Sequence, residues 1–365
     1  MKPLKIGNSL GKTNLLFGQD LPTLINFIVG VSSSSQSALN LERAKIDMAV
    51  ELGVHTITDL SIFRPNLPLW MYVKEKYPHV GVGINPPYFS YIENRGKISP
   101  KTVFEEIKNF ILSGGDQMTI NFFPRNVEEL NKLSALRMIP ITSRQGGMLA
   151  AYMRKYSADN PYYEIFDDII TIVKKYGVFI NIGASFRPAG ICEANDFVHN
   201  WEIEQQFNLY QKLNNLGVKS ALEIMSHQPL ETIGSGIQAI REKHGSYVPF
   251  QLLGPMVTDF VGTEDHIAAA IGIAEASRYN VGKITMVPPR EHVGFPSLDD
   301  SRIGVKSALI AVHAGDSTRI PGLRDIDKKI LEARANHLSC NPKSVRQGCE
   351  KCGNYCPLII AQKTK

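Results

Sequence analysis

The feature that most constrains the fold is a repeated alternation of short apolar runs with longer amphipathic stretches. The short runs are almost continuously apolar, which predicts strands buried on both faces of a parallel sheet. The longer stretches repeat apolar residues with a helical period, and several end in glycine, as helices commonly do. Strands are predicted over 25–31, 55–60, 80–85, 117–122, 138–142, 178–183, 220–225, 249–253 and 283–287. Helices are predicted over 39–53, 102–115, 162–177, 203–217 and 233–245.

Roughly 260 residues of such strand–helix units favour an α/β fold, a (β/α)8 barrel of the TIM type. Nine strand candidates are one more than this barrel holds, and 138–142 is the weakest because an unusually short helix precedes it. An open doubly wound sheet is the alternative, but no Gly-x-Gly-x-x-Gly motif follows the first strand. We expect an N-terminal segment over 1–24, the catalytic barrel over 25–300, C-terminal helices over 301–339 and a tail over 340–365.

The composition excludes several classes of protein. The chain of 365 residues is 43% hydrophobic and 21% charged, which is typical of a soluble globular protein. Its net charge of +5 comes from scattered basic residues, which indicates anionic small molecules and not nucleic acid as ligands. No apolar run approaches the ~20 residues that cross a bilayer, and no secretory signal opens the chain. We therefore expect a cytoplasmic protein without a membrane partner.

Polar side chains follow most of the predicted strands. In a barrel the carboxyl ends of the strands form one rim, where catalytic groups collect. Arginines, glutamates and histidines on one rim indicate an anion-binding pocket that also holds a metal. The polar residues are Asn85, Tyr88, Asn121, Ser143, Arg144, Ser185, Arg187, Glu223, His227, Arg290, Glu291 and His292.

Arg144 and Arg187 are natural phosphate ligands, because a guanidinium offers a fixed fork of donors to phosphate oxygens. Ser143 and the amides of Gly146 and Gly147 would add neutral donors. The alternative for either arginine is an ion pair on the surface.

His227 and His292 each follow an apolar strand and lie near a glutamate. In an extended backbone Glu223 and His227 point to the same side. Two neutral imidazoles would hold a divalent metal, zinc or iron, and leave positions open for a substrate. The alternative is a pair of loop histidines bonded to backbone carbonyls. Other polar pairs lie on helical patterns and are expected to be structural: Asp265 with His266, and His313 with Asp316.

The C-terminal tail holds three of the five cysteines, spaced as C-x2-C-x3-C from Cys349 through Cys352 to Cys356. It has too little apolar material to fold without a metal or a docking surface. Zinc is one reading, with Cys340 as the fourth ligand. Disulfides are disfavoured in a reducing compartment. The third reading is a 4Fe–4S cluster on three thiolates, whose open iron would bind S-adenosylmethionine. The cysteine spacing alone does not distinguish a zinc site from a 4Fe–4S cluster site.

Several sequence blocks resemble one enzyme family, phosphomethylpyrimidine synthase with its anaerobic sibling hydroxybenzimidazole synthase. The similarity runs from about Asn26 to the C-terminal cysteines, and the PREHVGFP segment with the late cysteine triplet is its most specific part. The blocks are TITDLS (56–61), PPYFSYIE (86–93), TSRQGG (142–147), FRPAGICEAND (186–196), PFQLLGPMVTD (249–259), VPPREHVGFPSLDD (287–300) and AVHAGD (311–316).

The resemblance implies a radical S-adenosylmethionine enzyme on a (β/α)8 barrel that rearranges 5-aminoimidazole ribonucleotide. By position, the cluster ligands correspond to Cys349, Cys352 and Cys356, and the metal ligands to His227 and His292. The resemblance also implies a homodimer in which one chain's tail covers the partner's site, and a reductant such as flavodoxin or ferredoxin. The substrate-binding residues are expected to be Tyr88, Asn121, Ser143, Arg144, Arg187, Glu223 and Gln251.

The chain also departs from the family pattern. The second cysteine gap is one residue shorter, and Ala184-Ser185-Phe186-Arg187 stands where the family has Asp-Gly-Leu-Arg. Asn121 replaces a histidine, Gln251 a tyrosine and Thr58 a substrate-contacting methionine, and the middle of the segment from Glu223 to His227 differs.

Metal ligands, phosphate arginines and thiols are thus retained, while groups that would touch a base and ribose differ. This combination predicts a radical carbon–carbon lyase or synthase acting on an altered phosphorylated substrate. One alternative is the family reaction unchanged, giving the thiamin pyrimidine or hydroxybenzimidazole. Another is a metal-dependent barrel hydrolase, or a binding protein, whose tail carries structural zinc.

Overall fold

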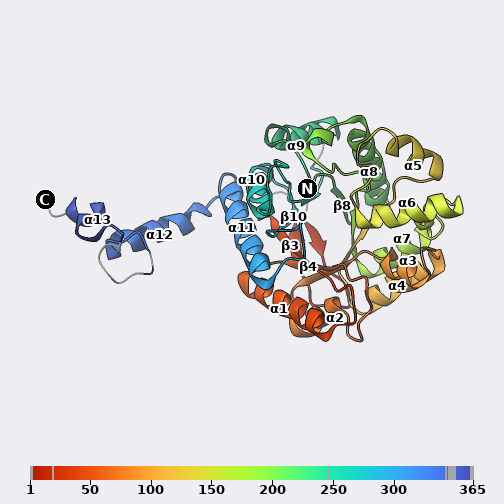
Figure 1. Cartoon of the computed structure of the whole chain (residues 1–365), viewed down its shortest axis with the longest axis horizontal. Coiled ribbons are helices and arrows are strands. Elements are labelled where there is room, and N and C mark those ends of the chain that lie inside the picture. Colours follow the sequence, from red (N-terminus) through yellow and green to blue (C-terminus); the bar gives the residue numbers. More distant parts are fainter. Residues whose placement is uncertain (1–2, 19, 245–246, 342, 344–350, 362–365) are drawn as a thin grey trace.

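The structure is a computed structural model that describes residues 3–18, 20–244, 247–341, 343 and 351–361. Eight parallel strands close into a barrel with the order β10-β3-β4-β5-β6-β7-β8-β9, surrounded by helices (Figure 1). The predicted (β/α)8 barrel is confirmed. Its strands are β3 (Leu24–Val29), β4 (Thr56–Asp59), β5 (Gly81–Ile84), β6 (Gln117–Ile120), β7 (Phe179–Ile182), β8 (Ser220–Glu223), β9 (Phe250–Leu253) and β10 (Lys283–Thr285).

The strand predicted over 138–142 is wrong. This segment is a loop between α5 (Val127–Ser134) and α6 (Arg144–Tyr156). The side chains of Met138 and Ile139 point outward, with Met138 84% exposed, and only Ile141 packs against the core. Pro140 has no N–H for a ladder, and a barrel closed by eight strands has no free edge for a ninth. Arg144 therefore begins a helix and does not end a strand.

Helices cover the outside of the barrel, and their ends follow local capping rules. The Ser35 side chain accepts from the Ala38 N–H at the start of α1, and Gly53 ends that helix in the left-handed conformation at φ 101°. The last barrel helix, α11, packs against both α1 and α10 and so closes the ring. The helices and 3₁₀ turns of the barrel, besides α5 and α6, are α1 (Gln36–Leu52), α2 (Leu69–Lys76), α3 (Pro87–Glu93), α4 (Pro100–Leu112), η1 (Pro161–Tyr163), α7 (Phe166–Tyr176), η2 (Ile191–Glu193), α8 (Phe197–Asn215), α9 (Leu230–His244), α10 (Asp265–Arg278) and α11 (Leu298–Asp316).

An antiparallel hairpin closes the amino-terminal end of the barrel. It pairs β1 (Leu4–Ile6) with β2 (Leu15–Phe17). Fully buried side chains of both strands pack against Leu24 and Phe179, which begin their barrel strands. The rings of Phe17 and Phe179 meet edge to face, with centroids 5.5 Å apart. Ligands must therefore enter from the carboxyl end.

The tail contrasts with this packing. Helix α12 (Arg324–His337) extends away from the barrel, and η3 (Gly353–Tyr355) and α13 (Pro357–Ile360) follow beyond it (Figure 1). None of the residues of α12 is buried. No helix among the described residues is long and apolar enough to span a membrane.

Candidate active site

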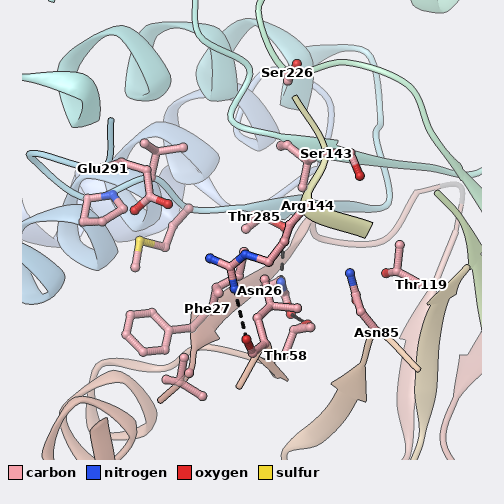
Figure 2. Close-up of a pocket in the computed structure, with 18 of the residues that line it drawn as sticks. Asn26, Phe27, Thr58, Asn85, Thr119, Ser143, Arg144, Ser226, Thr285 and Glu291 are labelled. Carbon is pink, nitrogen blue, oxygen red and sulfur yellow. Dashed lines mark hydrogen bonds between the residues drawn. The ribbon is translucent and has the colours of Figure 1, made fainter. Parts of the chain in front are cut away.

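A cavity of about 500 Å³ opens at the carboxyl end of the barrel strands. It is lined by side chains that approach from many parts of the ring (Figure 2). The nine barrel residues to which the sequence assigned ligands all line it; their individual roles stay predictions. They are Tyr88, Asn121, Ser143, Arg144, Arg187, Glu223, His227, Gln251 and His292.

Arg144 extends across this cavity from the first turn of α6 (Figure 2). One of its Nη1 hydrogens goes to the Leu60 carbonyl oxygen, 3.1 Å away, and the guanidinium carbon lies 5.8 Å from the centre of the Tyr88 ring. Among the described residues no other hydrogen bond uses the remaining donors of the fork, which are then open to a ligand. The Ser143 side chain caps the helix by accepting from the Gly146 N–H at 3.1 Å, and the Gly147 N–H donates to the Ser143 carbonyl. The two glycine amides are thus used inside the helix.

Arg187 and Glu223 form the second charged part of the wall. The Arg187 Nη1 atom lies 3.8 Å from Glu223 Oε1, at the edge of ion-pair range. Burial raises the pKa of Glu223, while the charge of Arg187 acts to lower it. The Gln251 side-chain amide donates to Glu223 Oε2 at 3.4 Å. This arrangement holds a carboxylate beside a guanidinium in a largely buried wall.

Two buried charged residues that the sequence search missed hold the loop that carries Arg187. The Arg137 guanidinium donates to both oxygens of Asp196 at 2.8 Å and to the Phe186 carbonyl oxygen. The Glu202 carboxyl group, on α8, accepts from the main-chain N–H groups of Ser185 at 2.7 Å and Phe186 at 2.8 Å. Burial raises the pKa of Glu202 to about 8. Neither residue follows a strand, so a search of strand ends passes over both.

The two site histidines lie together, with ring centroids 5.5 Å apart. His227 Nδ1 is 2.8 Å from Asp259 Oδ1, and His292 Nδ1 is 2.8 Å from Asp265 Oδ1. The alternative in which each histidine bonds a backbone carbonyl is therefore wrong. Asp265, expected to be only structural, orients His292 from a fully buried position. Burial lowers the pKa of His227, which favours the neutral ring that a metal needs.

A carboxylate on Nδ1 fixes the ring and leaves Nε2 for a metal, which is the usual outer-shell arrangement of metal-bound histidines. Neither Nε2 has a hydrogen-bond partner in the part of the chain that the structure describes. That part also contains no group of three or more His, Cys, Asp and Glu side chains arranged around one metal position. The residues present fit a divalent ion held by two imidazoles, with its other ligands coming from a bound molecule.

The other polar side chains of the cavity differ in whether their buried polar atoms have hydrogen-bond partners. Both amide hydrogens of Asn121 go to hydroxyl groups, Ser143 Oγ at 3.1 Å and Ser185 Oγ at 3.0 Å. By contrast, Asn85 Oδ1 and Gln251 Oε1 are buried oxygens without a hydrogen-bond partner among the described residues. Such atoms cost free energy unless a water or ligand donates to them.

The tail cysteines lie on a different part of the chain. Cys352 is half-buried and Cys356 is 1% exposed, and η3 separates them. Cys356 also caps the short α13. Cys349, the first predicted cluster ligand, lies outside the described residues. Cys352 and Cys356 thus flank one 3₁₀ turn, and their role as cluster ligands stays a prediction.

A barrel closed at one end, with cationic and histidine-rich walls at the other, has the layout of a small-molecule enzyme. The model of the radical SAM ThiC family matches residues 5–363, and the chain belongs to this family. The enzymes of this family are of the radical S-adenosylmethionine type, which implies a 4Fe–4S cluster and S-adenosylmethionine.

Relatives and solved structures add the following similarities. A phosphomethylpyrimidine synthase of Desulforamulus reducens is 31% identical over 374 residues, covering 95% of this chain and 85% of the relative. One of Natronomonas pharaonis is 30% identical over 323 residues, covering 88% and 67%. Among solved structures, a dihydropteroate synthase of Thermus thermophilus covers 87% of this chain and 99% of its own, with 10% identity and a TM-score of 0.48.

Proposed function

We propose that this protein is a radical carbon–carbon lyase or synthase that rearranges a phosphorylated, ribonucleotide-like small molecule. The observation that carries the proposal is the convergence of Arg144, Arg187, Glu223 and two carboxylate-oriented histidines on one cavity of about 500 Å³. The family membership supplies the radical chemistry. The replacements at Thr58, Asn121 and Gln251 favour a substrate that differs from 5-aminoimidazole ribonucleotide.

The chain's own side chains would bind and orient this substrate. Arg144 and Arg187 would hold the phosphate, because each guanidinium keeps donors that no described residue uses. Glu223 would accept a hydrogen from a hydroxyl or amino group. The hairpin that closes the other end of the barrel keeps water from entering behind the substrate, which a radical reaction requires.

The tail and the histidines would hold the cofactors. Cys349, Cys352 and Cys356 would bind a 4Fe–4S cluster, and His227 with His292 would bind zinc or iron. When bound, the cluster and S-adenosylmethionine supply a 5′-deoxyadenosyl radical. A one-electron reductant such as flavodoxin or ferredoxin would serve the cluster.

A homodimer would bring the tail to a cavity. Helix α12 buries none of its residues against its own barrel, and α12 and α13 stand away from it (Figure 1). A second copy placed beside this chain would allow the tail of one to cover the cavity of the other. Such an arrangement would close the open end of the barrel during the reaction.

Anaerobic reconstitution tests the proposal. The protein would be purified without oxygen, loaded with iron and sulfide, and incubated with S-adenosylmethionine and dithionite. We expect a reduced-cluster signal in electron paramagnetic resonance and the release of 5′-deoxyadenosine. A preparation that holds one zinc and no iron would contradict the radical function and favour the hydrolase or binding protein with a zinc tail.

Adding 5-aminoimidazole ribonucleotide distinguishes the two radical hypotheses, an altered substrate and the unchanged family substrate. Turnover that it does not stimulate supports the altered substrate. Conversion of this ribonucleotide to the thiamin pyrimidine or to hydroxybenzimidazole, identified by mass spectrometry, would instead show that the substrate is unchanged.

A further inference from the structure

A second cavity lies at the amino-terminal end of the barrel, on the side opposite the candidate active site. Its volume is about 360 Å³. Its wall combines β1 and the turn that follows it, the last turn of α7, and the residues that lead into β7 and β8. No described residue that the proposed function uses lines this wall. The cavity is thus separate from the candidate active site.

Lysine is the only charged residue type in the wall of this cavity. The four lysines are Lys5, Lys174, Lys175 and Lys219, and no aspartate or glutamate among the described residues lines it. None of the four forms an ion pair with a carboxylate in the described part of the chain. A concave surface lined by one sign of charge raises the local concentration of counter-ions. We call this cavity the lysine pocket.

Helix dipoles do not account for so much positive charge. Lys174 and Lys175 lie in the last turn of α7, and α8 ends just before another part of the wall. The carboxyl end of a helix is equivalent to roughly −0.5 elementary charge, so two ends supply about −1 against four ammonium groups. An excess of about three positive charges remains. Lys5, on a hairpin strand, and Lys219, just before β8, belong to neither helix.

Lys219 is half-buried, whereas the other three lysines are exposed. Its ammonium group donates one hydrogen to the Gly177 carbonyl oxygen at 3.3 Å, which leaves two of its three donors for a ligand. Burial, and after it the positive charge of Lys5, lowers the pKa of Lys219. The two lysines come from different elements and repel one another, so an anion bound between them would relieve that repulsion.

The turn after β1 is fixed in place by the protein itself. The Asn8 side-chain amide donates to the carbonyl oxygens of Ile111 at 2.7 Å and Gly115 at 2.8 Å, and Asn8 is buried. The Ser9 N–H donates to the Tyr176 carbonyl oxygen at 2.9 Å. These bonds attach the hairpin to the ends of α4 and α7. The wall of the lysine pocket therefore exists before a ligand binds.

Two glycines keep the lysine pocket open. Both lie in the left-handed conformation, Gly177 at φ 71° and Gly217 at φ 78°. A Cβ atom at Gly177 would lie 3.5 Å from Lys219 Nζ, and one at Gly217 would lie 3.7 Å from Lys174 Cε. The lysine side chains thus lie close to bare backbone, and the space that larger side chains would fill stays free for a ligand.

We propose that the lysine pocket binds a small anion that carries two or more linked phosphate groups, at a site separate from the reaction. Lysine ammonium groups are compact charges on flexible stems, which suit a phosphate chain better than a single planar carboxylate. An excess of about three positive charges is matched better by a diphosphate than by one phosphate group. Such a ligand would connect the hairpin to α7 and to the start of β8.

Isothermal titration calorimetry on the full chain tests this site, with pyrophosphate as the probe. We expect pyrophosphate to bind at least tenfold more tightly than inorganic phosphate. Lys5→Met with Lys219→Met should weaken pyrophosphate binding about tenfold, since two charge contacts are lost. Lys101→Met with Lys306→Met removes the same charge from exposed positions on α4 and α11 and should have no effect. Equal losses in the two double variants, or no pyrophosphate binding by the wild type, would overturn the site.

The two phosphate sites give opposite results. Arg144→Met should weaken the binding of ribose 5-phosphate and leave that of pyrophosphate unchanged, whereas Lys5→Met with Lys219→Met should do the reverse. If only Arg144→Met weakens pyrophosphate, the ion binds in the carboxyl-end cavity and the lysine pocket is overturned. If ribose 5-phosphate does not bind while pyrophosphate binding depends on the lysines, the lysine pocket stands and the phosphate site of the proposed function falls.

A single variant keeps the test decisive if the double variant does not fold. Lys5 is exposed and makes no hydrogen bond or ion pair with a described residue, so Lys5→Met should fold as the wild type does. We expect it to weaken pyrophosphate binding about threefold, as for one exposed charge contact. A loss no larger than that of Lys306→Met alone would overturn the site.

Discussion

The barrel and the tail obtain their functional residues in opposite ways. In the barrel, strand register places Glu223, Gln251 and Lys283 in one row, and buried partners fix what each atom can do. In the tail, α12 has no buried residue. Residues of the barrel are thus positioned by the protein's own core, whereas α12 is not, and we expect the tail to depend on what it binds.

The largest effect is expected in the tail. Cys352→Ser should abolish the formation of 5′-deoxyadenosine, because a three-thiolate cluster that loses one ligand is not held. The thermal unfolding midpoint of the barrel should not change, since Cys352 lies outside it. Iron content and product are measured by absorbance and chromatography, with Cys192→Ser as the matched control. Full iron loading in Cys352→Ser would contradict the assignment of Cys352 as a cluster ligand. If replacing Cys340 also causes loss of iron or zinc, Cys340 is a ligand of the same site.

Next comes the phosphate wall of the barrel. Arg144→Met should weaken the binding of a phosphate ester 10- to 100-fold, as expected for charged hydrogen bonds worth about 1.5–3 kcal/mol. Arg154 lies on the same helix but donates to Asn131 and Ser134, so Arg154→Met is the control. Calorimetry with ribose 5-phosphate measures both. Equal losses in the two variants would mean that helix α6 as a whole, and not the guanidinium of Arg144, supports binding.

At the metal site, a change in the carboxylate that orients a histidine should lower the metal affinity. Asp259→Asn weakens the hold on His227 without touching its Nε2, and we expect metal affinity to fall 10- to 100-fold. Competition with a chelating dye measures zinc binding. Asp168→Asn, an exposed change at the start of α7, should leave it unchanged. Undiminished affinity in Asp259→Asn would show that the two histidines do not bind the metal through this arrangement.

The stability of the barrel should fall with pH because of His199. This buried ring accepts from the Asn195 N–H through Nδ1, so Nε2 carries the proton and donates to the Ile224 carbonyl. Burial lowers its pKa to about 4, against 6.5 in the unfolded chain. Below pH 6.5 the unfolded state therefore binds more protons, and stability is lost as pH falls towards 4.

Between pH 7.5 and pH 5 this residue should remove roughly 2 kcal/mol from the free energy of unfolding, because each pKa unit corresponds to 1.36 kcal/mol. Urea unfolding of the wild type and of His199→Gln isolates its share from that of the other histidines. Parallel pH profiles for the two proteins would count against a neutral buried ring.

The smallest effect is expected from removing the tail. Ending the chain after Pro321 deletes α12 and all later elements, and none of their described residues belongs to the barrel core. The thermal midpoint of the barrel should be unchanged by differential scanning calorimetry. A decrease in the thermal midpoint that depends on protein concentration would contradict the independence of barrel and tail, since it would show that the tail stabilises a second copy.

The sequence predicted the barrel well because its signals are local. Continuous apolar runs identified all eight strands, and the rule that strand ends share a rim placed Tyr88, Asn121, Arg187, Glu223, His227 and His292 in one cavity. Ser143 and Arg144 also line it, but from the start of a helix and not from the predicted strand end, and Gln251 was expected only from the family resemblance. The same signal failed at 138–142, where exposed Met138 and Ile139 imitate a strand. The hairpin strands β1 and β2 were missed because runs of three residues are too short to show a period.

Contacts between residues that are distant in the sequence could not be predicted from local sequence patterns. Arg137 and Asp196 are far apart in the chain, as are His227 and Asp259, and nothing near either partner marks the pair. Asp265 lies on a helical pattern, and only its contact with His292 gives it a role beyond structure. In the sequence Lys283 is only the polar first residue of a strand. The strand register is needed to show that its side chain faces the barrel interior.

The sequence by itself determined the family, the barrel and the kinds of groups in the site, because these follow from local periodicity and from motifs. Tertiary structure decided the partners: which carboxylate orients each histidine, which amides are used inside a helix, and which oxygen of Gln251 is left unpaired. Hydrogen bonds and charge effects act between atoms a few ångströms apart, and only the closed barrel brings those atoms together.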